Sequence, residues 1–235
     1  MLGQIYKDFK VSFVPLLCIG MLAVFVVALS FMEGSVVEKT SIVALGLFNI
    51  NLFLPILAMF TAYDADEKEK WISYAVTLPG GIAGYVKSKY VYIIILMFLG
   101  AAFTHLYACI YDGICNMVNL TQIDFLLIMI ADGIGMILTA FHFPFVFRFG
   151  EQKGNMLAGV VTVILLLTYY CYMMFGNLSL FERDDLEQYL IKWAMNHSEE
   201  IKIGVLMLFF VGIFAMVISY HIAARIFKKG GAVSE

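Results

Sequence analysis

The sequence has few charged residues for its length. Only 14% of its 235 residues are Asp, Glu, Lys or Arg, while 62% are hydrophobic. In soluble domains about 25% of residues are charged and about half are apolar. So little charge excludes a separate soluble domain of useful size, and we expect no nucleic acid among the partners. Most of the chain is predicted to lie in lipid.

Sequence motifs of catalysis and nucleotide binding are also absent. The pattern G-x-x-x-x-G-K-[ST] does not occur, so the chain cannot hold ATP in a phosphate-binding loop of that kind. H-E-x-x-H and G-x-S-x-G are missing, and no second Asp within an apolar segment completes an aspartyl pair with Asp132. We therefore expect no enzymatic activity and no cofactor bound by this chain. Any energy that the chain uses must therefore come from a partner or from a gradient.

The 4 cysteines lack the spacing of a metal site, and we expect no bound metal. We interpret them as small apolar side chains. Cys109 and Cys115 fall near the predicted outer surface, where a disulfide between them is the alternative.

Apolar segments of about 20 residues each run through the chain. A hydrocarbon core of roughly 30 Å needs about 20 helical residues to cross it, and helices satisfy their own backbone hydrogen bonds there. The pattern therefore predicts an all-α membrane protein with six transmembrane helices, a single domain over residues 1–235. The predicted spans are 11–31, 42–62, 90–110, 125–147, 155–175 and 203–223.

Basic residues fall mainly on one side of the predicted bundle. Cytoplasmic loops retain Lys and Arg, whereas short translocated loops exclude them. The side that includes both termini has 11 basic residues, and the opposite side has 4, which are Lys39, Arg183, Lys192 and Lys202. We therefore expect both termini in the cytoplasm.

Residues 1–10 have the pattern of an amphipathic helix. Four apolar residues recur at helical spacing, with charged residues elsewhere on the turn. They are Leu2, Ile5, Tyr6 and Phe9. Such a pattern is typical of a short helix in the membrane interface, and we expect an N-terminal elbow helix that leads into the first span. The alternative is a frayed terminus that only orients this span.

The loop at residues 64–89 is charged in its first half and amphipathic in its second. Three acids suit the N-terminal end of a helix, and four apolar residues recur at i, i+3, i+4 and i+7. The acids are Asp64, Asp66 and Glu67, and the apolar face consists of Trp71, Tyr74, Ala75 and Leu78. We predict a short cytoplasmic helix that ends at residues 79–81, before a new helix near Ile82. It is either a docking surface for a cytoplasmic partner or a solvated turn with a Trp anchor.

Two cytoplasmic segments carry distinctive motifs. The first is Asp66-Glu67-Lys68-x-x-Trp71-x-x-Tyr74-x-x-x-Leu78-Pro79, followed by Lys87-Ser88-Lys89-Tyr90 at the start of the third span. The second, at the end of the fourth span, is Pro144-Phe145-Val146-Phe147-Arg148-Phe149-Gly150-Glu151-Gln152-Lys153-Gly154. These motifs, their spacing and the six-span layout resemble the family of ABC-2-type permeases. One departure is Gly80-Gly81, because the family usually has Ser or Arg after the Leu-Pro pair.

The resemblance implies a membrane subunit that dimerises, with itself or with a sister chain, and binds a separate subunit that holds ATP and Mg. It implies a coupling helix with contacts to that ATPase at Asp64, Asp66, Glu67, Lys68, Lys70, Trp71, Tyr74, Leu78 and Pro79. A second cytoplasmic contact is implied at Arg148, Gly150, Glu151 and Lys153. A narrower resemblance, to bacterial exporters of phenol-soluble modulins, implies amphipathic peptide cargo and a location in the bacterial plasma membrane.

Four polar residues fall within the outer half of the predicted spans. A charged side chain in a span costs at least about 2.5 kcal/mol, so it needs a partner or an aqueous cavity. The four residues are Asn49, Asn51, His105 and Asp132. They line a translocation path as one cluster, or Asp132 and His105 form an interhelical pair without contact to cargo. An ion- or proton-coupled transporter that uses Asp132 and His105 is the alternative function.

The outer loop at residues 176–200 contains an amphipathic pattern over residues 183–196. ABC-2 permeases similarly carry outer helices at this place, where they cap the exit of the pathway. We expect an outer amphipathic helix between spans five and six that acts either as a lid or as a passive interface anchor. The lid residues are Asp184, Asp185, Glu187 and Trp193.

Overall fold

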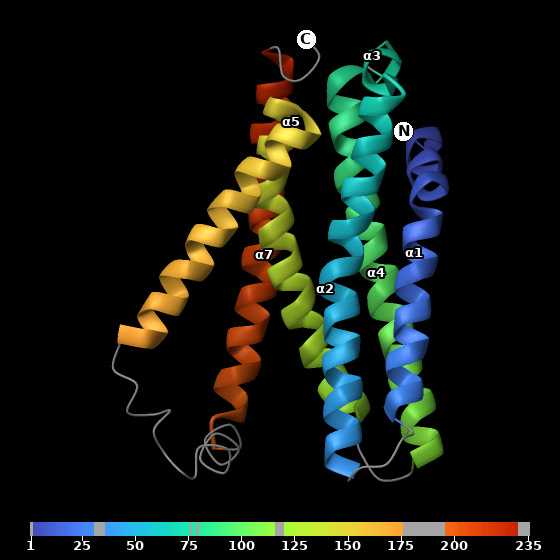
Figure 1. The fold of residues 1–235 in the computed structure, drawn as a ribbon, viewed down its shortest axis with the longest axis vertical. Helices are drawn as coiled ribbons and strands as arrows, with labels where there is room; N and C mark the ends of the chain where they lie inside the picture. Colours follow the sequence, from blue (N-terminus) through green and yellow to red (C-terminus); the bar gives the residue numbers. More distant parts are fainter. Residues whose placement is uncertain are drawn as a thin grey trace.

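Every regular element in the described part of the chain is a helix. The computed structural model describes residues 2–30, 36–75, 77, 78, 80–115, 120–175 and 196–229, and no strand occurs among them. The helices are α1 (Leu2–Ser30), α2 (Val36–Lys68), α3 (Trp71–Ala75), α4 (Gly81–Cys115), α5 (Leu120–Phe175) and α7 (Ser198–Lys228). The long helices run roughly side by side, and the short α3 lies at one end of the bundle (Figure 1). The predicted all-α architecture is confirmed for these residues.

The predicted spans fall on these helices. Each of the six ranges is helical, apart from residue 31, which lies outside the described residues. Among the described residues, four segments are long and apolar enough to cross a membrane, namely Gly46–Lys68, Gly81–Ile110, Phe125–Gly150 and Ser198–Lys228. They overlap the predicted second, third, fourth and sixth spans, so the chain is a multi-pass membrane protein. Crossings by α1 and by the last part of α5 stay predictions.

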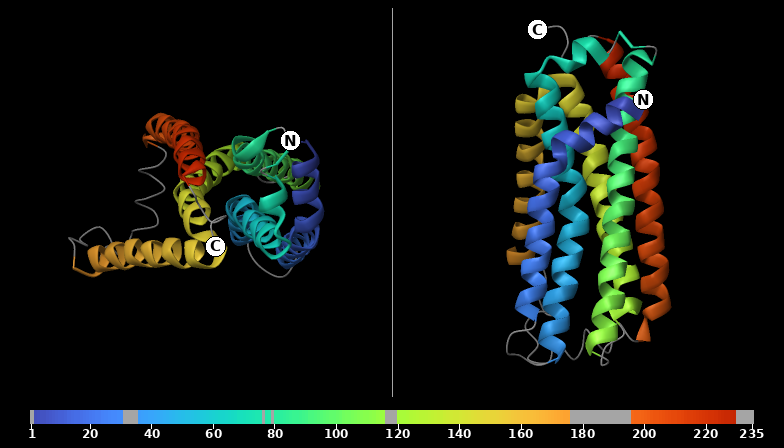
Figure 2. Two further views of the ribbon diagram at one scale, coloured as in Figure 1. Left: turned by 90° about the horizontal axis from the view of Figure 1, so that it is seen from above. Right: turned by 90° about the vertical axis from the view of Figure 1, so that its right-hand side faces the viewer.

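Helix α1 begins at the end of the bundle where α3 lies and where α7 ends (Figure 1). Its first turns are inclined to the rest of the helix, which fits the predicted elbow (Figure 2). Tyr6 is exposed and Ile5 is buried, but Gln4, Asp8 and Ser12 are buried as well, at i, i+4 and i+8. The face that packs on the bundle is therefore partly polar, contrary to the predicted division into an apolar face and a charged face.

The acids of the cytoplasmic loop lie on a different helix from the one predicted. Helix α2 continues to Lys68, so Asp64, Asp66 and Glu67 occupy its last turns and not the first turn of the next helix. Lys70 then takes a φ of 53°, a conformation that an α-helix cannot continue through. The predicted favourable interaction of these acids with a helix N-terminus is therefore wrong.

The predicted cytoplasmic helix, which follows this break, is short. Helix α3 has 5 residues, and its buried residues are Ile72 and Ala75. Within the predicted apolar face, Ala75 is buried and Trp71 packs against the core, but Tyr74 is 54% exposed, so this face is only partly buried. The helix ends at Ala75 and not at residues 79–81, and a turn in which the Gly81 amide donates to the Leu78 carbonyl leads into α4. The start of α4 at Gly81 agrees with the prediction to one residue.

Helix α5 consists of two arms joined by a sharp turn at Gly150, which has a φ of 78° and a ψ of 175°. Glycine adopts such a left-handed conformation without steric cost. A Cβ added to Gly154 would lie 2.6 Å from the Val146 Cα, so the arms touch backbone to backbone. His142 and Asn155 share a hydrogen bond of 2.9 Å across the turn. The second arm runs back at an angle to the bundle (Figure 1). The two glycines of the second motif therefore have separate roles, since Gly150 forms the turn and Gly154 lets the arms touch.

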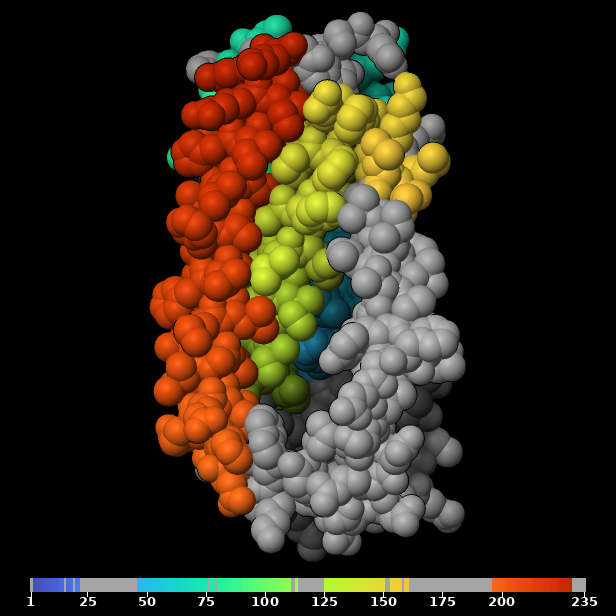
Figure 3. Space-filling view, turned by 90° about the vertical axis from the view of Figure 1, so that its left-hand side faces the viewer, coloured from blue at the N-terminus to red at the C-terminus, as the bar shows by residue number. Residues whose placement is uncertain are grey.

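The first arm of α5 packs along α7 (Figure 3). A Cβ added to Gly212 would lie 2.9 Å from the Gly133 carbonyl oxygen, and one added to Gly133 would lie 3.1 Å from Leu208 Cγ. Small residues at such positions let two membrane helices approach closely. The glycines therefore set the spacing of these two helices.

Aromatic side chains join four helices at the end where α3 lies. Tyr63, Tyr85, Phe147 and Phe227 come from α2, α4, α5 and α7, and all four are buried. The centroid of the Phe147 ring lies 5.6 Å from that of Tyr63, 6.2 Å from Tyr85 and 5.5 Å from Phe227. Edge-to-face contacts at these distances stabilise aromatic clusters beyond simple burial. They hold the helices together beside the polar site described next.

Candidate functional site

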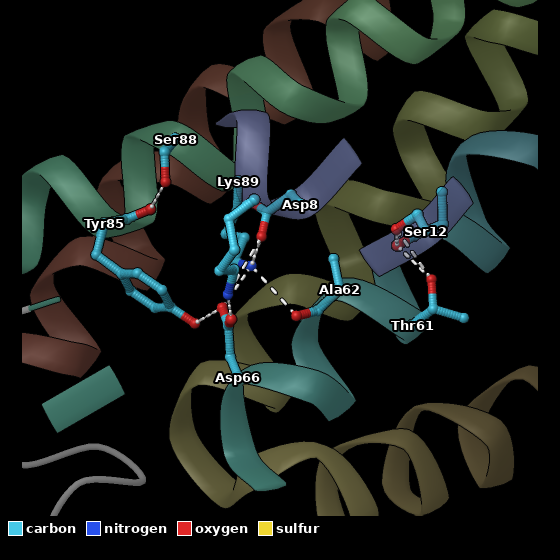
Figure 4. A network of polar contacts seen from close by, with 10 residues as sticks. Asp8, Ser12, Thr61, Ala62, Asp66, Tyr85, Ser88 and Lys89 are labelled. Atoms are coloured by element: carbon cyan, nitrogen blue, oxygen red, sulfur yellow. Dashed lines mark hydrogen bonds and ion pairs between the residues drawn. The ribbon is translucent and has the colours of Figure 1, made fainter. Parts of the chain in front are cut away.

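Two acids and two lysines from three helices meet inside this end of the bundle (Figure 4). Lys89 of α4 lies between Asp8 of α1 and Asp66 of α2. Its Nζ is 2.8 Å from Asp8 Oδ1 and 2.5 Å from Asp66 Oδ2. Lys7 forms further ion pairs, one with Asp66 and one of 3.6 Å with Asp8. We call Lys7, Asp8, Asp66 and Lys89 the ion cluster, and its opposite charges balance.

The core of the ion cluster is buried and hydrogen-bonded. Asp8 is 1% exposed, Asp66 0% and Lys89 3%. The Tyr85 hydroxyl donates to Asp66 Oδ2 at 2.9 Å, and Lys89 also donates to the Ala62 carbonyl oxygen at 3.4 Å. Buried charges are tolerated when they are paired and hydrogen-bonded, whereas removal of one partner costs about 3–5 kcal/mol. The ion cluster therefore ties α1, α2 and α4 together at one position.

Lys7 is the member of the ion cluster with the most access to solvent. Its side chain is 17% exposed, compared with 4% for Lys89. Burial, and after it the neighbouring Lys89 ammonium, lowers the pKa of Lys7 to about 8, while Asp8 opposes this shift. Burial therefore favours the neutral form of Lys7 under mildly alkaline conditions.

Lys7 also connects the ion cluster to α3. Its ammonium lies over the Trp71 ring, 4.8 Å from the ring centroid, at the distance of a cation–π interaction. The Trp71 ring is 5.0 Å from the ring of Tyr74, which is 54% exposed. A chain of contacts therefore runs from an exposed side chain on α3 through Trp71 and Lys7 to the buried acids.

The structure divides the predicted docking residues of the loop into a buried and an accessible group. Asp66 is buried in the ion cluster, which corrects the prediction that it belongs to a docking surface. Asp64 pairs with Lys68 across one turn of α2 at 2.6 Å. Pro79 lies outside the described residues. The accessible residues, exposed or half-buried, are Asp64, Glu67, Lys68, Lys70, Trp71, Tyr74 and Leu78.

The second predicted cytoplasmic contact lies beside the first. A Cβ added to Gly150 would lie 3.3 Å from Glu67 Oε1, so the turn of α5 touches the end of α2. Arg148 and Lys153 are exposed on either side of this turn. Glu151 is part of α5, but the structure does not describe its side chain. The structure thus brings together two motifs that are about 80 residues apart in the sequence.

The polar residues predicted within the spans do not form one cluster. Asn51 donates a hydrogen bond to Thr104, and both are buried. Asn49 and His105 are exposed. Asp132 is 7% exposed and lines a separate cavity between α4, α5 and α7. Asn49, Asn51 and His105 do not line this cavity, so the single cluster is not formed, whereas the pair of Asp132 and His105 stays a prediction.

The predicted outer lid falls on residues whose structure is not described. Asp184, Asp185, Glu187 and Trp193 all lie outside the described residues, so the lid stays a prediction. Cys109 is a free thiol, which is contrary to the alternative of a disulfide with Cys115.

Four residues of the site are not among the site residues predicted from the sequence, namely Lys7, Asp8, Tyr85 and Lys89, although Lys89 belongs to the first motif. One signal for Asp8 is present, because Gln4, Asp8 and Ser12 form a polar stripe on a mainly apolar helix. Polar groups on the inner face of such a helix indicate a buried polar contact. The partner of Asp8 is 81 residues away in the chain, so no local pattern identifies Lys89.

The sequence matches one family model over nearly its whole length. The model is described as ABC-2 family transporter protein, and the match covers residues 5–228. In comparisons with curated proteins and with solved structures, no match is found. The matched range includes the ion cluster and both of the motifs that are predicted to lie in the cytoplasm. The chain therefore belongs to the ABC-2 transporter family, as a multi-pass membrane protein.

Proposed function

We propose that this chain is the permease subunit of an ATP-driven exporter and is coupled through its first cytoplasmic loop to a separate ATPase subunit. Membership of the ABC-2 family supports a role in membrane transport. The sequence contains no phosphate-binding loop, so ATP and Mg would be held by the partner. The chain itself would supply the path through the membrane.

One observation carries the coupling part of this proposal, the chain of contacts from Tyr74 to the ion cluster. Tyr74 and Trp71 lie on α3, and Lys7 joins them to acids of α1 and α2. A buried ion cluster with balanced charges ties the helices that carry its members to one another. A displacement of α3 by the ATPase would therefore move three helices together instead of bending one loop.

The accessible residues around α3 suit a protein partner. Asp64, Glu67, Lys68 and Lys70 provide charges of both signs at the edge, and Tyr74 provides an exposed ring. Aromatic residues within a polar rim are typical of protein interfaces. The turn at Gly150 adds a neighbouring surface. We infer that the ATPase contacts both cytoplasmic motifs.

The remaining parts of the proposal concern cargo and assembly. We infer a dimer because the second arm of α5 diverges from its own bundle, so a second permease copy can pack against it (Figure 1). We infer that both termini lie in the cytoplasm. In support, α1 begins and α7 ends at the same end of the bundle (Figure 1). We infer amphipathic peptide cargo and a location in the bacterial plasma membrane from the resemblance to phenol-soluble-modulin exporters.

A matched pair of tyrosine variants tests the coupling surface. Tyr74→Ala removes the exposed ring of α3, and Tyr6→Ala removes a ring of α1 that is 73% exposed. Truncation of a central aromatic residue costs at least about 2 kcal/mol at many interfaces. We expect Tyr74→Ala to weaken binding of a co-expressed ATPase at least about tenfold and to abolish its stimulation, and Tyr6→Ala to do neither. Equal effects of the two variants would contradict the proposal.

A second candidate function is an ion- or proton-coupled transporter. The observation that favours it is the buried Asp132, whose Oδ1 has no hydrogen-bond partner among the described residues. The exposed position of His105 speaks against a relay between the two. Proteoliposomes that contain only this chain distinguish the two functions. Solute uptake driven by a pH gradient and lost in Asp132→Asn would support this alternative.

A further inference from the structure

A groove opens on the side of the bundle between α4 and α7, with the first arm of α5 as its floor. Its volume is about 480 Å³. The right-hand view of Figure 2 shows α4 and α7 side by side with α5 behind them. On the rim, Ile94 is 41% exposed, Phe98 73%, Ile213 40% and Val217 50%. Because these helices are predicted to span the membrane, the groove is open to lipid.

The lining of the groove is mainly apolar and adaptable. Met97, Met136 and Met216 contribute flexible thioether side chains, which adapt to irregular ligands. Phe209 adds an aromatic ring. The hydroxyl of Tyr90, another lining residue, already shares a hydrogen bond of 2.6 Å with Ser219. Most of the groove therefore suits a hydrocarbon chain.

Asp132 is the exception in this lining. It is 93% buried, since its exposed fraction is 7%, and its Oδ1 has no hydrogen-bond partner among the described residues. The contacts of its neighbours hold it in place. A Cβ added to Gly133 would lie 3.1 Å from Leu208 Cγ, and one added to Gly135 would lie 3.3 Å from Met97 Cε. The first arm of α5 is therefore closely packed against α4 and α7 beside Asp132.

The lysine that lines the groove is too far away to neutralise this acid. Lys87 precedes Met97 by ten residues of α4, which corresponds to about 15 Å along the helix. Gly135 lies level with Met97, and Asp132 is about one turn further from Lys87. The two charged groups are therefore about 20 Å apart along the groove, beyond the reach of a lysine side chain.

From this geometry we propose that the groove binds a single-chain hydrophobic amine that enters from the bilayer. The ammonium group lies on Asp132 and supplies its missing hydrogen bond, and the chain runs past the methionines toward Lys87. A neutral chain leaves Asp132 Oδ1 without a partner, and a carboxylate or phosphate at this end meets a like charge. The site belongs to the isolated chain and does not depend on the proposed coupling to an ATPase.

The test uses two photoreactive probes that differ only in their head group. Dodecylamine and dodecanol, each with a diazirine on the alkyl chain, are added to the purified chain in nanodiscs, and labelled residues are mapped by mass spectrometry. We expect the amine to label the groove at least about tenfold more than the alcohol, a difference of about 1.4 kcal/mol. Asp132→Asn keeps the size of the side chain and should make the two probes label equally.

Three further variants complete the test. Ile213→Trp fills the groove from its rim while Asp132 stays in place, and it should abolish labelling by both probes. Val211→Trp adds the same ring at a position of α7 that is 56% exposed and outside the groove, and it should leave labelling unchanged. Lys87→Gln should also leave the preference for the amine unchanged.

Two outcomes would overturn the proposal. One is equal labelling of the groove by the amine and the alcohol in the unmodified chain, and the other is labelling that Ile213→Trp does not reduce. If Asp132→Asn does not fold, as judged by circular dichroism and elution volume, two measurements still test the proposal. They are the ratio of amine to alcohol labelling in the unmodified chain and the labelling of Ile213→Trp. No ATPase is present, so failure here is distinct from failure of the proposed exporter function.

Discussion

At the scale of single residues, the position of Lys89 has the strongest consequence for stability. Its ammonium lies between two carboxylates that are almost fully buried, Asp8 and Asp66. Without it, only the partly exposed Lys7 remains to offset two negative charges. A buried charge that loses its partner destabilises a protein far more than a missing surface charge does.

We expect Lys89→Met to lower the free energy of unfolding by about 3–5 kcal/mol, because it leaves two buried acids with one cation. Lys87→Met is the matched control, since Lys87 lies two residues away and is exposed, and it should change stability by less than about 0.5 kcal/mol. Unfolding of both variants by denaturant in detergent micelles measures this difference. Similar losses would contradict the role of the ion cluster. Adding Asp8→Asn to Lys89→Met should recover part of the loss.

Lys7 carries a prediction about pH. Its pKa is lowered from 10.5 to about 8, so its ammonium should titrate with a midpoint near pH 8. The unfolded chain keeps the ordinary pKa and binds more protons between these two pH values. The contribution of Lys7 to the free energy of unfolding therefore rises with pH from about 8 to about 10.5. Carbon-13 NMR of the reductively methylated chain, assigned with Lys7→Arg, measures the midpoint. A midpoint at or above 10.5 would show that the attraction of Asp8 and Asp66 outweighs burial.

At the scale of elements, the two arms of α5 depend on glycines in two different ways. Gly150 is required for its backbone conformation, because its φ of 78° is in the left-handed region. Gly154 is required for space, because the backbone of Val146 lies against it. Gly159, further along the same helix, has no atom within 4 Å of an added Cβ.

We expect Gly154→Ala to destabilise the chain most, since its Cβ would lie 2.6 Å from a backbone atom that cannot turn aside. Gly150→Ala should cost about 1–3 kcal/mol through backbone strain. Gly159→Ala, the control, should be neutral or stabilise by up to about 1 kcal/mol, because Ala favours a helix interior. Thermal unfolding of the three variants gives the order. If Gly159→Ala is as harmful as Gly154→Ala, the backbone contact between the arms is not the cause.

At the scale of the whole molecule, the arrangement places α3 and the start of α7 at opposite ends of the bundle (Figure 1). From the excess of Lys and Arg we expect the end with α3 to lie in the cytoplasm. Exposed positions exist at both ends, Ser73 on α3 and Glu199 on α7. The orientation is therefore open to a direct test.

We expect Ser73→Cys to react with a membrane-impermeant maleimide only in inside-out vesicles, and Glu199→Cys only in right-side-out cells. The native cysteines are first replaced by Ala or Ser. The reason is that each position lies at one end of helices long enough to cross the membrane. Reaction of both positions from the same side would contradict the arrangement of the helices across the membrane.

The sequence alone determined the helical architecture and the position of the membrane. Its apolar segments are long enough to cross a bilayer, and in lipid the backbone has no alternative partner for its hydrogen bonds. It also located the two cytoplasmic motifs, because glycine, proline and charge patterns act over a few residues. The prediction was wrong for Asp64 and Glu67. Acidic residues are favoured at the start of a helix, but these two lie in the last turns of α2.

Only the tertiary structure decided which polar residues lie inside. Asp66 and Lys89 read as surface charges in the sequence. They are buried because they pair with each other, and because Lys7 and Asp8, on a helix distant in sequence, pair with Asp66 and Lys89. Asn51 and Asp132 fall at similar depth in the predicted spans. Asn51 meets Thr104 of α4 and forms a hydrogen bond with it, whereas Asp132 lines the groove between α4 and α7. A sequence pattern gives the face and depth of a side chain, whereas its partner depends on how the helices pack.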